Sequence, residues 1–393
     1  MTDYIKKALP GNLVNIGWTL LGAGILLGLL GFFIDFNRAL FAYLVAFLFI
    51  LSIAAGALFL IALEYITGAD WSVPIRRVVE FLASVLPLLI IIVLPLLFNM
   101  DQIFHWAQKE AAAKDALLQH KSPYLNVPFF LIRVFAVFII WGLFYYLLNK
   151  NSEKQDLNGD QSLTKKNIVL SGLFMPVFAI TITVASIDWT MSIEPHWFST
   201  IFGVYFFSGT VVGSLAAITL IVVLLMEKGY LHPKMNNEHL YSLGALTFAF
   251  INFWGYIAFS QYLLIWYADL PEENFWFLTR WHGGWQFFSI ALIVVHFVIP
   301  YALLLSQPSK MNPKRLKFTA VWLLAAHLLD LYWLAMPSLL NHGKGYSFSW
   351  IDFVFPASTV GLFIIIFFTR AQRNNLVPVK DPKLERGLNF RLN

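Results

Sequence analysis

The stretch that decides the fold is FAYLVAFLFILSIAAGALFLIAL, from Phe41 to Leu63, which carries no charged side chain. A helix needs about 20 mainly apolar residues to cross the hydrocarbon of a bilayer, which is about 30 Å thick. Other stretches of the chain meet the same requirement, so the sequence predicts ten membrane-spanning helices. In chain order the predicted spans are Leu13–Ile34, Phe41–Leu63, Val79–Phe98, Phe129–Leu148, Ile168–Ile187, Phe198–Met226, Leu240–Ala268, Gly283–Leu305, Phe318–Leu339 and Phe353–Phe368.

Composition and charge exclude a water-soluble globular protein. Hydrophobic residues make up 59% of the chain and charged residues only 12%, against about 25% charged residues in soluble domains. The net charge of +5 resides in the loops between spans, so it does not indicate nucleic-acid binding. The chain has no cysteine, which excludes disulfides, thiolate zinc sites and iron–sulfur clusters held by this chain.

Lysine and arginine predict the orientation, because loops rich in them stay on the cytoplasmic side during insertion. Of the 27 basic residues, 20 lie before the first span, in the loops that follow even-numbered spans, or in the tail. Six lie in the other loops, and Arg133 lies inside a span. The sequence therefore predicts that both termini are cytoplasmic.

The loops indicate a single polytopic membrane domain that occupies the whole chain. Segment 13–148 holds spans 1 to 4, segment 168–368 holds spans 5 to 10, and the polar segment 149–167 is expected to be a flexible cytoplasmic link. Segment 101–120 is expected to form a short surface helix. Spans 2 to 5 and spans 6 to 9 both begin on the outer face. We therefore expect two parallel four-helix bundles, flanked by spans 1 and 10.

Titratable side chains of spans 8 and 9 are the main candidates for function. Four polar residues of span 8 share one helical stripe through spacings of 4, 3 and 7, namely His282, Gln286, Ser289 and His296. In span 9, His327 and Asp330 share a face. Antiparallel packing of the two spans would place His296 and His327 at similar depth. Because an Asp at the centre of a membrane helix costs about 2.5 kcal/mol or more, a functional role is the default hypothesis.

Three kinds of site fit this cluster. A histidine pair on facing helices can ligate a b-type haem, but only one pair is present and no small-residue clearance surrounds it. A quinol pocket uses a carboxylate or imidazole as proton acceptor beside apolar walls. A proton relay needs titratable groups at successive depths, and the cluster would supply them if it continued to Glu64 and Glu80 near the cytoplasmic face. This depth series favours the relay.

Span 7 carries Asn252, Tyr256 and Ser260 at helical spacing, with Gln261 on a neighbouring face. These side chains can hydrogen-bond water or a carbonyl group in a functional site. The alternative is that they only hold helices together.

Two outer regions also leave alternatives open. Arg133 of span 4 and Asp188 of span 5 form either a structural ion pair or, with His196, part of a proton exit. The next outer loop, 266–282, gathers tryptophan and tyrosine around three carboxylates. It is either an interfacial aromatic belt or a docking surface for a peripheral partner.

Two outer segments resemble a known family. They are DWTMSIEPHWFSTIFGVY, from Asp188 to Tyr205, and FSQYLLIWYADLPEE, from Phe259 to Glu273. Both resemble the ActF-type subunit of bacterial alternative complex III, within the NrfD-like family of polysulfide-reductase membrane subunits. The resemblance extends to the length of the chain and its ten spans.

The resemblance implies a subunit of a quinol:cytochrome c oxidoreductase in the bacterial inner membrane. Such a subunit holds no haem or iron–sulfur cluster, since these belong to partner subunits. The implied partners are a quinol-binding paralogue, an iron–sulfur subunit, and multihaem and monohaem cytochromes c. Family members are described as quinone-binding or as proton-translocating, and the quinol-oxidising site is attributed to the paralogue.

We therefore expect a subunit without its own redox centre that contributes a transmembrane proton pathway, with quinone binding left open. We assign no catalytic residue and expect no metal site. A proton-coupled secondary transporter and a purely structural anchor are the alternatives. A transporter predicts spans broken by glycine or proline at the midplane, whereas the prolines of this chain lie mostly toward span ends.

Overall fold

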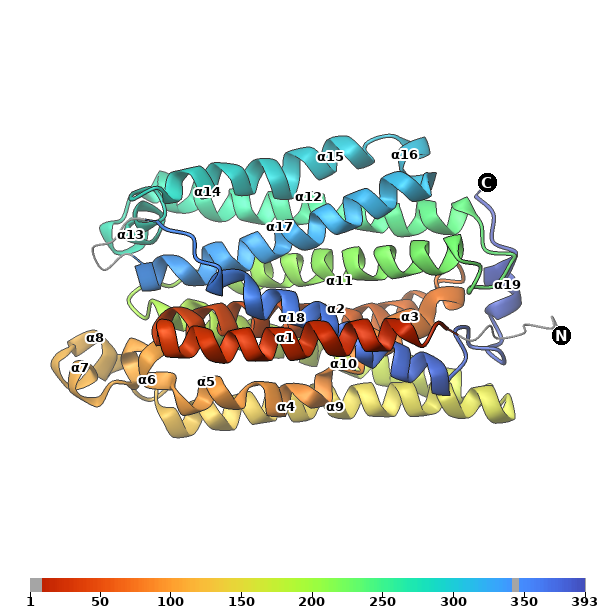
Figure 1. Cartoon of the computed structure of the whole chain (residues 1–393), viewed down its shortest axis with the longest axis horizontal. Coiled ribbons are helices and arrows are strands. Elements are labelled where there is room, and N and C mark those ends of the chain that lie inside the picture. The colour runs from red at the N-terminus through yellow and green to blue at the C-terminus, as the bar shows by residue number, and fades with distance from the viewer. Residues whose placement is uncertain (1–8, 341–345, 393) are drawn as a thin grey trace.

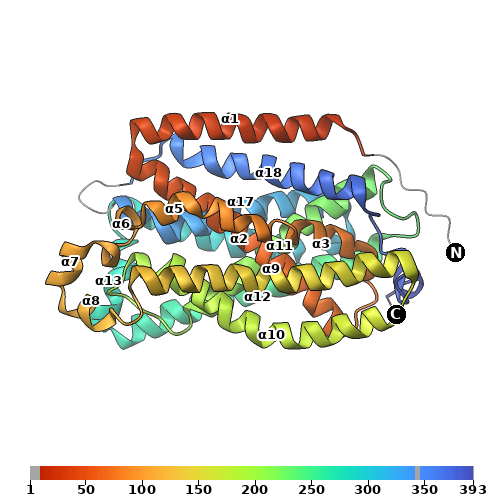
Figure 2. The ribbon, with the colours of Figure 1, turned by 90° about the horizontal axis from the view of Figure 1, so that it is seen from below.

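Long helices lie side by side in one bundle (Figures 1 and 2). The computed structural model describes residues 9–340 and 346–392, and no strand occurs among them. Ten helical segments in these ranges are long and apolar enough to cross a membrane. The chain is therefore an all-α, multi-pass integral membrane protein, as the sequence predicts.

Most spans are single helices that extend beyond the apolar runs. They are α1 (Asn12–Ile34), α2 (Phe36–Thr67), α9 (Val127–Asn158), α10 (Ser162–Trp189), α11 (Phe202–Glu227), α12 (Asn237–Ala268), α17 (Pro313–Leu340) and α18 (Ile351–Arg373). Span 3 consists of η1 (Val73–Ile75), α3 (Arg76–Ala83), η2 (Leu86–Leu88), α4 (Leu89–Ile92) and α5 (Leu94–Phe98). Span 8 consists of α14 (Trp285–Leu292), the π-helical turn η5 (Ile293–Val298) and α15 (Ile299–Leu304).

The spans form the two expected four-helix bundles. In the first, α2 packs on α3 and α10, and α9 packs on α10 and on span 3. In the second, α11 packs on α12 and α17, and both of these pack on span 8. The bundles meet where α2 contacts α11 and α17. Helices α1 and α18 lie against each other on one side, as Figure 2 shows, and α18 joins them to α2.

Helix α2 is the central element of the molecule. The most apolar window of α2 is buried completely inside the protein. Small residues allow this, because helices in membranes approach closely where side chains are short. A Cβ atom on Gly56 would lie 2.1 Å from Ser214 Oγ of α11, so only glycine fits at this crossing. The apolar stretch Phe41–Leu63, which decides the fold class, therefore also lies where the two bundles meet.

Span 3 differs from the regular helix that the sequence predicts. Its first helix ends at Ala83, and only short helical segments follow. Pro87 and Pro95 lie in this part of the span, and neither has an N–H to continue the helical hydrogen bonds. The expectation that prolines lie mostly toward span ends was wrong for Pro87 and Pro176, which fall near the middle of spans 3 and 5.

Segment 149–167, which was predicted to be a flexible cytoplasmic link, is helical. Helix α9 continues to Asn158 and α10 begins at Ser162, so only three residues around Gly159 turn the chain. Polar side chains join the two helices, since Asn167 Nδ2 donates to the Leu148 carbonyl at 3.0 Å. The polar side chains that had suggested a flexible link therefore form contacts between α9 and α10.

The outer segment 101–120 also differs from the single surface helix that was expected. It consists of short pieces, namely α6 (Met100–Ile103), η3 (His105–Ala107), α7 (Lys109–Lys114) and α8 (Ala116–Lys121). Extended residues separate them, including Asp115, whose carboxylate accepts from the Leu117 and Leu118 N–H groups at the start of α8. The remaining short helices are η4 (Met191–Ile193), α13 (Pro271–Thr279), α16 (Gln307–Met311) and α19 (Leu384–Leu388).

The start of α1 and the end of α18 lie at the same end of the bundle, together with α3, α16 and α19 (Figure 1). Helices α6, α7, α8 and α13 lie at the opposite end. That the α19 end faces the cytoplasm remains a prediction from the basic residues. Of those residues, Lys6, Lys7 and Lys344 lie outside the described ranges.

Candidate functional site

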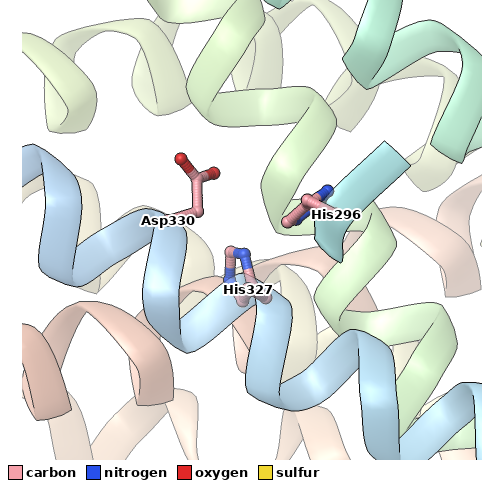
Figure 3. A group of neighbouring side chains, drawn as sticks. All are labelled: His296, His327 and Asp330. Carbon is pink, nitrogen blue, oxygen red and sulfur yellow. The ribbon is translucent and has the colours of Figure 1, made fainter. Parts of the chain in front are cut away.

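The structure brings together His296, His327 and Asp330 inside the second bundle (Figure 3). One ligand atom from each residue lies within 4.8 Å of the others, and all three side chains are buried. The two imidazole centroids are 6.5 Å apart. Titratable groups from spans 8 and 9 therefore lie close together in the protein interior.

Local backbone structure places the two histidines. His327 and Asp330 are one turn apart on α17 and face α11. His296 lies in the π-helical turn η5. Such turns are rare in proteins, and those that occur are often found at functional sites. Pro300 follows this turn and has no N–H for the carbonyl of His296. The resulting break in regular helical bonding is confined to the turn that carries the histidine.

Ser52 of α2 fixes the proton on His327. The Ser52 hydroxyl donates to the Phe49 carbonyl at 3.0 Å, so its oxygen is left to accept. His327 Nε2 lies 2.8 Å from that oxygen, and with the Ser52 hydroxyl directed at Phe49 it is Nε2 that carries the ring proton. Nδ1 is then the unprotonated nitrogen, and it has no hydrogen-bond partner. Its lone pair remains available inside the site.

Asp330 accepts hydrogen bonds from two aromatic side chains. The Tyr205 hydroxyl of α11 donates to Oδ1, and the Trp254 indole N–H of α12 donates to Oδ2 at 3.2 Å. Among the described residues, no lysine or arginine forms an ion pair with Asp330. A carboxylate in a membrane segment without a cationic partner is unusual, because burying an unpaired charge costs several kcal/mol. Asp330 is therefore held by two uncharged hydrogen-bond donors and not by an ion pair.

Trp254 also covers His296. The two rings stack with their centroids 3.9 Å apart. Neither nitrogen of the buried His296 ring has a hydrogen-bond partner. An imidazole carries at least one N–H and prefers to bond both nitrogens, so this ring is equipped for a ligand outside the chain.

Two glycines of α11 make room for the cluster. A Cβ atom on Gly213 would lie 2.6 Å from His327 Cδ2. A Cβ atom on Gly209 would lie 3.4 Å from Asp330 Oδ2 and 3.6 Å from His327 Nδ1. The expectation that no small residues surround the histidines was therefore wrong. Asp330 and the unprotonated nitrogen of His327 both lie near Gly209, and two buried acceptors so close together favour a proton or a cation between them.

The candidates near the outer face have other partners. Arg133 and Asp188 form a bidentate ion pair, with Nε–Oδ2 at 2.8 Å and Nη2–Oδ1 at 2.9 Å. His196 lies at the surface, where Nε2 is 2.6 Å from Asp115 Oδ2. The Leu118 N–H and the His196 ring hold the pKa of Asp115 below its ordinary value. The structure thus places Asp188 and His196 in separate interactions.

The two glutamates predicted near the cytoplasmic face are also paired. Glu64 bonds Arg76 at 2.6 Å, and Glu80 bonds Arg77 at 2.5 Å. Twelve residues of α2 separate Ser52 from Glu64, which is about 18 Å of helix. The intervening side chains of α2 are all apolar. The structure therefore brings neither glutamate to the cluster.

The supporting polar residues of spans 7 and 8 do not reach the cluster. Asn252 bonds the Phe248 carbonyl of its own helix, and Tyr256 is 66% exposed on the outside of the bundle. Ser260 is half-buried, and Gln261 is buried with an unpartnered Oε1.

The upper part of the span 8 stripe serves the outer end of the second bundle. His282 is exposed, and Gln286 accepts from the Gly284 N–H at 3.0 Å. Ser289 accepts from the indole N–H of Trp333 at 2.9 Å, which joins span 8 to α17.

Sequence reasoning missed the side chains that complete the site. Ser52, Tyr205 and Trp254 come from three different helices, and none is titratable near neutral pH. Tyr205 closes the first of the two quoted outer segments. The first segment contacts the helix that begins at the end of the second, because Trp197 stacks on Trp276 of α13 with their centroids 4.3 Å apart. Helical spacing within one span gives no signal for such contacts.

Comparisons with known proteins do not name a family. No family model matches the chain. No curated protein matches its sequence either.

Proposed function

We propose that this chain is a membrane subunit of a respiratory quinol:cytochrome c oxidoreductase of the alternative complex III type, and that it carries protons through the membrane. The observation that carries the proton role is Asp330, a buried carboxylate held by Tyr205 and Trp254 without a cationic partner. Such a group can bind and release a proton without breaking an ion pair. The assignment to the complex rests on the two quoted outer segments.

The neighbouring histidines suit this role. His327 presents an unprotonated nitrogen beside Asp330, so a proton on the carboxyl group has an acceptor within the site. His296 has two unpartnered nitrogens, one of which can accept the proton next. Imidazoles are common proton carriers because their ordinary pKa lies near neutral pH. In this proposal, Asp330 and the two histidines form the central part of the relay.

The remaining parts of the proposal follow from the assignment of this chain to an alternative complex III. Redox centres belong to partner subunits, which are a quinol-binding paralogue, an iron–sulfur subunit and cytochromes c. The complex lies in a bacterial inner membrane with both termini of this chain in the cytoplasm. Quinone binding by this chain stays open. Because Asp188 and the two glutamates are ion-paired, water is needed to extend the relay toward either face.

A proton-coupled transporter receives less support from the structure. Inverted or parallel repeats predict that broken helices occur at corresponding places in the two halves. Span 3 is the second span of the first bundle, whereas span 8 is the third span of the second bundle. The two interruptions therefore do not correspond.

The test uses the intact complex in sealed proteoliposomes. In Asp330→Asn, we expect the number of protons translocated per electron to fall, while electron transfer from quinol to cytochrome c continues. The exposed Asp160→Asn is the matched control and should translocate as the unmodified complex does. An assembled Asp330→Asn complex with the normal number of protons per electron contradicts the proton role. Purification of the tagged chain from its native membrane without any haem subunit contradicts the assignment to the complex.

A further inference from the structure

The cluster of His296, His327 and Asp330 also has the composition of a metal site. Two imidazole nitrogens and one carboxylate oxygen lie within 4.8 Å of one another. All three residues are buried, and three of the four imidazole nitrogens have no hydrogen-bond partner. Buried polar atoms are normally bonded, so unpartnered nitrogens at one point indicate a missing ligand.

We infer that His296, His327 and Asp330 bind one divalent transition-metal ion of the zinc type, each through a single atom. The inference does not rest on the proposed function. Because the ion would occupy the His327 nitrogen and the Asp330 oxygen that the relay uses, it describes a metal-bound state in which these atoms do not carry protons. Imidazole and carboxylate ligands suit Zn²⁺, whereas Mg²⁺ and Ca²⁺ prefer oxygen ligands alone.

The surroundings of His327 and Asp330 match those of metal ligands. A ligating histidine usually gives its other N–H to a fixed acceptor, which sets the tautomer and aims the lone pair. Ser52 does this for His327, since its oxygen accepts from Nε2 and leaves Nδ1 unprotonated. A ligating carboxylate is in turn held by hydrogen bonds. Tyr205 and Trp254 do this for Asp330.

The cluster needs only a small contraction to bind an ion. Zinc lies about 2.0–2.2 Å from nitrogen and oxygen ligands, so tetrahedral ligand atoms are about 3.4 Å apart. The spread of up to 4.8 Å must therefore close by about 1.4 Å. This closure has to come from rotation of the three side chains and from small movements of the π-helical turn that carries His296.

The number of protein ligands leaves one position open. Three protein ligands plus a water molecule are typical of zinc sites that are not purely structural. The one negative charge of Asp330 offsets half of the charge of a divalent ion. Metal-bound water is more acidic than free water and can supply hydroxide as the second anion. The site can therefore reach neutrality without another carboxylate.

The test measures metal on the purified full chain in detergent. The chain is stripped with a chelator, incubated with Zn²⁺ and desalted, and bound zinc is counted per chain; Co²⁺ is titrated as a visible-absorption probe. We expect about one tightly bound ion and a cobalt spectrum of nitrogen and oxygen ligands. His296→Ala, His327→Ala and Asp330→Asn should each lose at least about tenfold in affinity.

Two further variants make the test specific. His196→Ala removes an exposed histidine that also lies beside a carboxylate, that of Asp115, and should bind as the unmodified chain does. Ser52→Ala leaves all three ligands and removes the acceptor that fixes His327, so it should weaken binding by about tenfold. This variant keeps the test decisive if a ligand variant fails to fold.

Three results would overturn the inference. They are a folded chain that takes up no tight zinc, uptake that the ligand variants leave unchanged, and uptake that only His196→Ala abolishes. Any of these leaves the proton measurement on Asp330→Asn unaffected. Conversely, tight zinc on a chain whose Asp330 variant pumps normally supports the metal site and contradicts the proton role. The two proposals therefore fail separately.

Discussion

The guanidinium of Arg280 donates through Nε to the main-chain carbonyl of Trp333 at 3.2 Å. In a regular helix this carbonyl would accept from residue 337, but Pro337 has no N–H. Arg280 therefore replaces the donor that the proline removes. The side chain is fully buried, stacks on Trp276 and bonds two further carbonyls, those of Trp276 and Leu334.

We expect Arg280→Met to lower thermal stability in detergent by about 2–3 kcal/mol, because three buried carbonyls lose a charged donor. Exposed Arg386→Met is the control, since its surface ion pair with Asp70 contributes about 0–1 kcal/mol. A second background sharpens the test. In Pro337→Ala the helix can supply its own N–H to Trp333, so Arg280→Met should cost less there. An equal loss in both backgrounds contradicts the proposed link with the proline.

Gly213 of α11 lies against the ring of His327. Gly213→Ala places a methyl group 2.6 Å from His327 Cδ2, so either the ring or α11 must move. We expect Gly213→Ala to lower the free energy of unfolding by about 1–3 kcal/mol. We also expect it to weaken zinc binding and to reduce proton translocation. Gly142→Ala in α9 is the matched control, because nothing lies within 4 Å of its added Cβ atom. It should be neutral or stabilising by up to about 1 kcal/mol. Equal melting temperatures of the two variants would refute the steric argument.

The sequence predicts the class of fold because membrane insertion depends on local composition. A run such as Phe41–Leu63 needs no partner to be recognised, and its complete burial at the centre of the molecule is a separate property. Helix boundaries were less predictable. The polar ends of α9 and α10 look like a loop in the sequence, whereas Asn167 joins them by a side-chain hydrogen bond. Such bonds depend on where two helices meet.

The candidate site was predictable only in part, for the same reason. His327 and Asp330 share a face through spacing within one helix, and His296 meets them at similar depth. The side chains that define their chemistry come from other helices. Ser52 lies 275 residues before His327, and Tyr205 lies 125 residues before Asp330. No single-span pattern indicates these contacts.

The ion pair of Arg133 and Asp188 gives a third prediction, which concerns stability. Both side chains are buried, and the guanidinium also lies 3.8 Å from the centroid of the Tyr124 ring. Removing one partner leaves an unpaired charge, so Asp188→Asn or Arg133→Gln alone should cost about 3–5 kcal/mol. The double variant should recover much of that loss, and a thermal double-mutant cycle measures the difference.

The same double variant decides whether Asp188 belongs to a proton exit. The double variant removes both the carboxylate and the guanidinium. It therefore leaves neither a titratable group nor an unpaired charge at this position. If the pair is structural, its complex should translocate the normal number of protons per electron. A loss of translocation in a stable, assembled double variant would instead assign Asp188 to the proton path.

The C-terminal segment after α18 offers a test of orientation. Asp381 accepts from Arg76 at 2.5 Å, and Lys383 donates to the Gly68 carbonyl at 2.8 Å, so this segment is tied to the ends of α2 and α3. We expect Asp381→Asn to loosen these ties, since Arg76 then keeps only Glu64 as an ionic partner.

Trypsin should therefore cut the tail several-fold faster in Asp381→Asn than in the unmodified protein. If the α19 end faces the cytoplasm, cleavage occurs in inverted vesicles and not in right-side-out vesicles. Asp160→Asn, in the turn between α9 and α10, changes an exposed carboxylate near the same end and should leave the cleavage rate unchanged. Cleavage only in right-side-out vesicles would reverse the orientation that the basic residues predict. Equal rates for the variant and the unmodified chain would show that contacts other than Asp381 hold the segment.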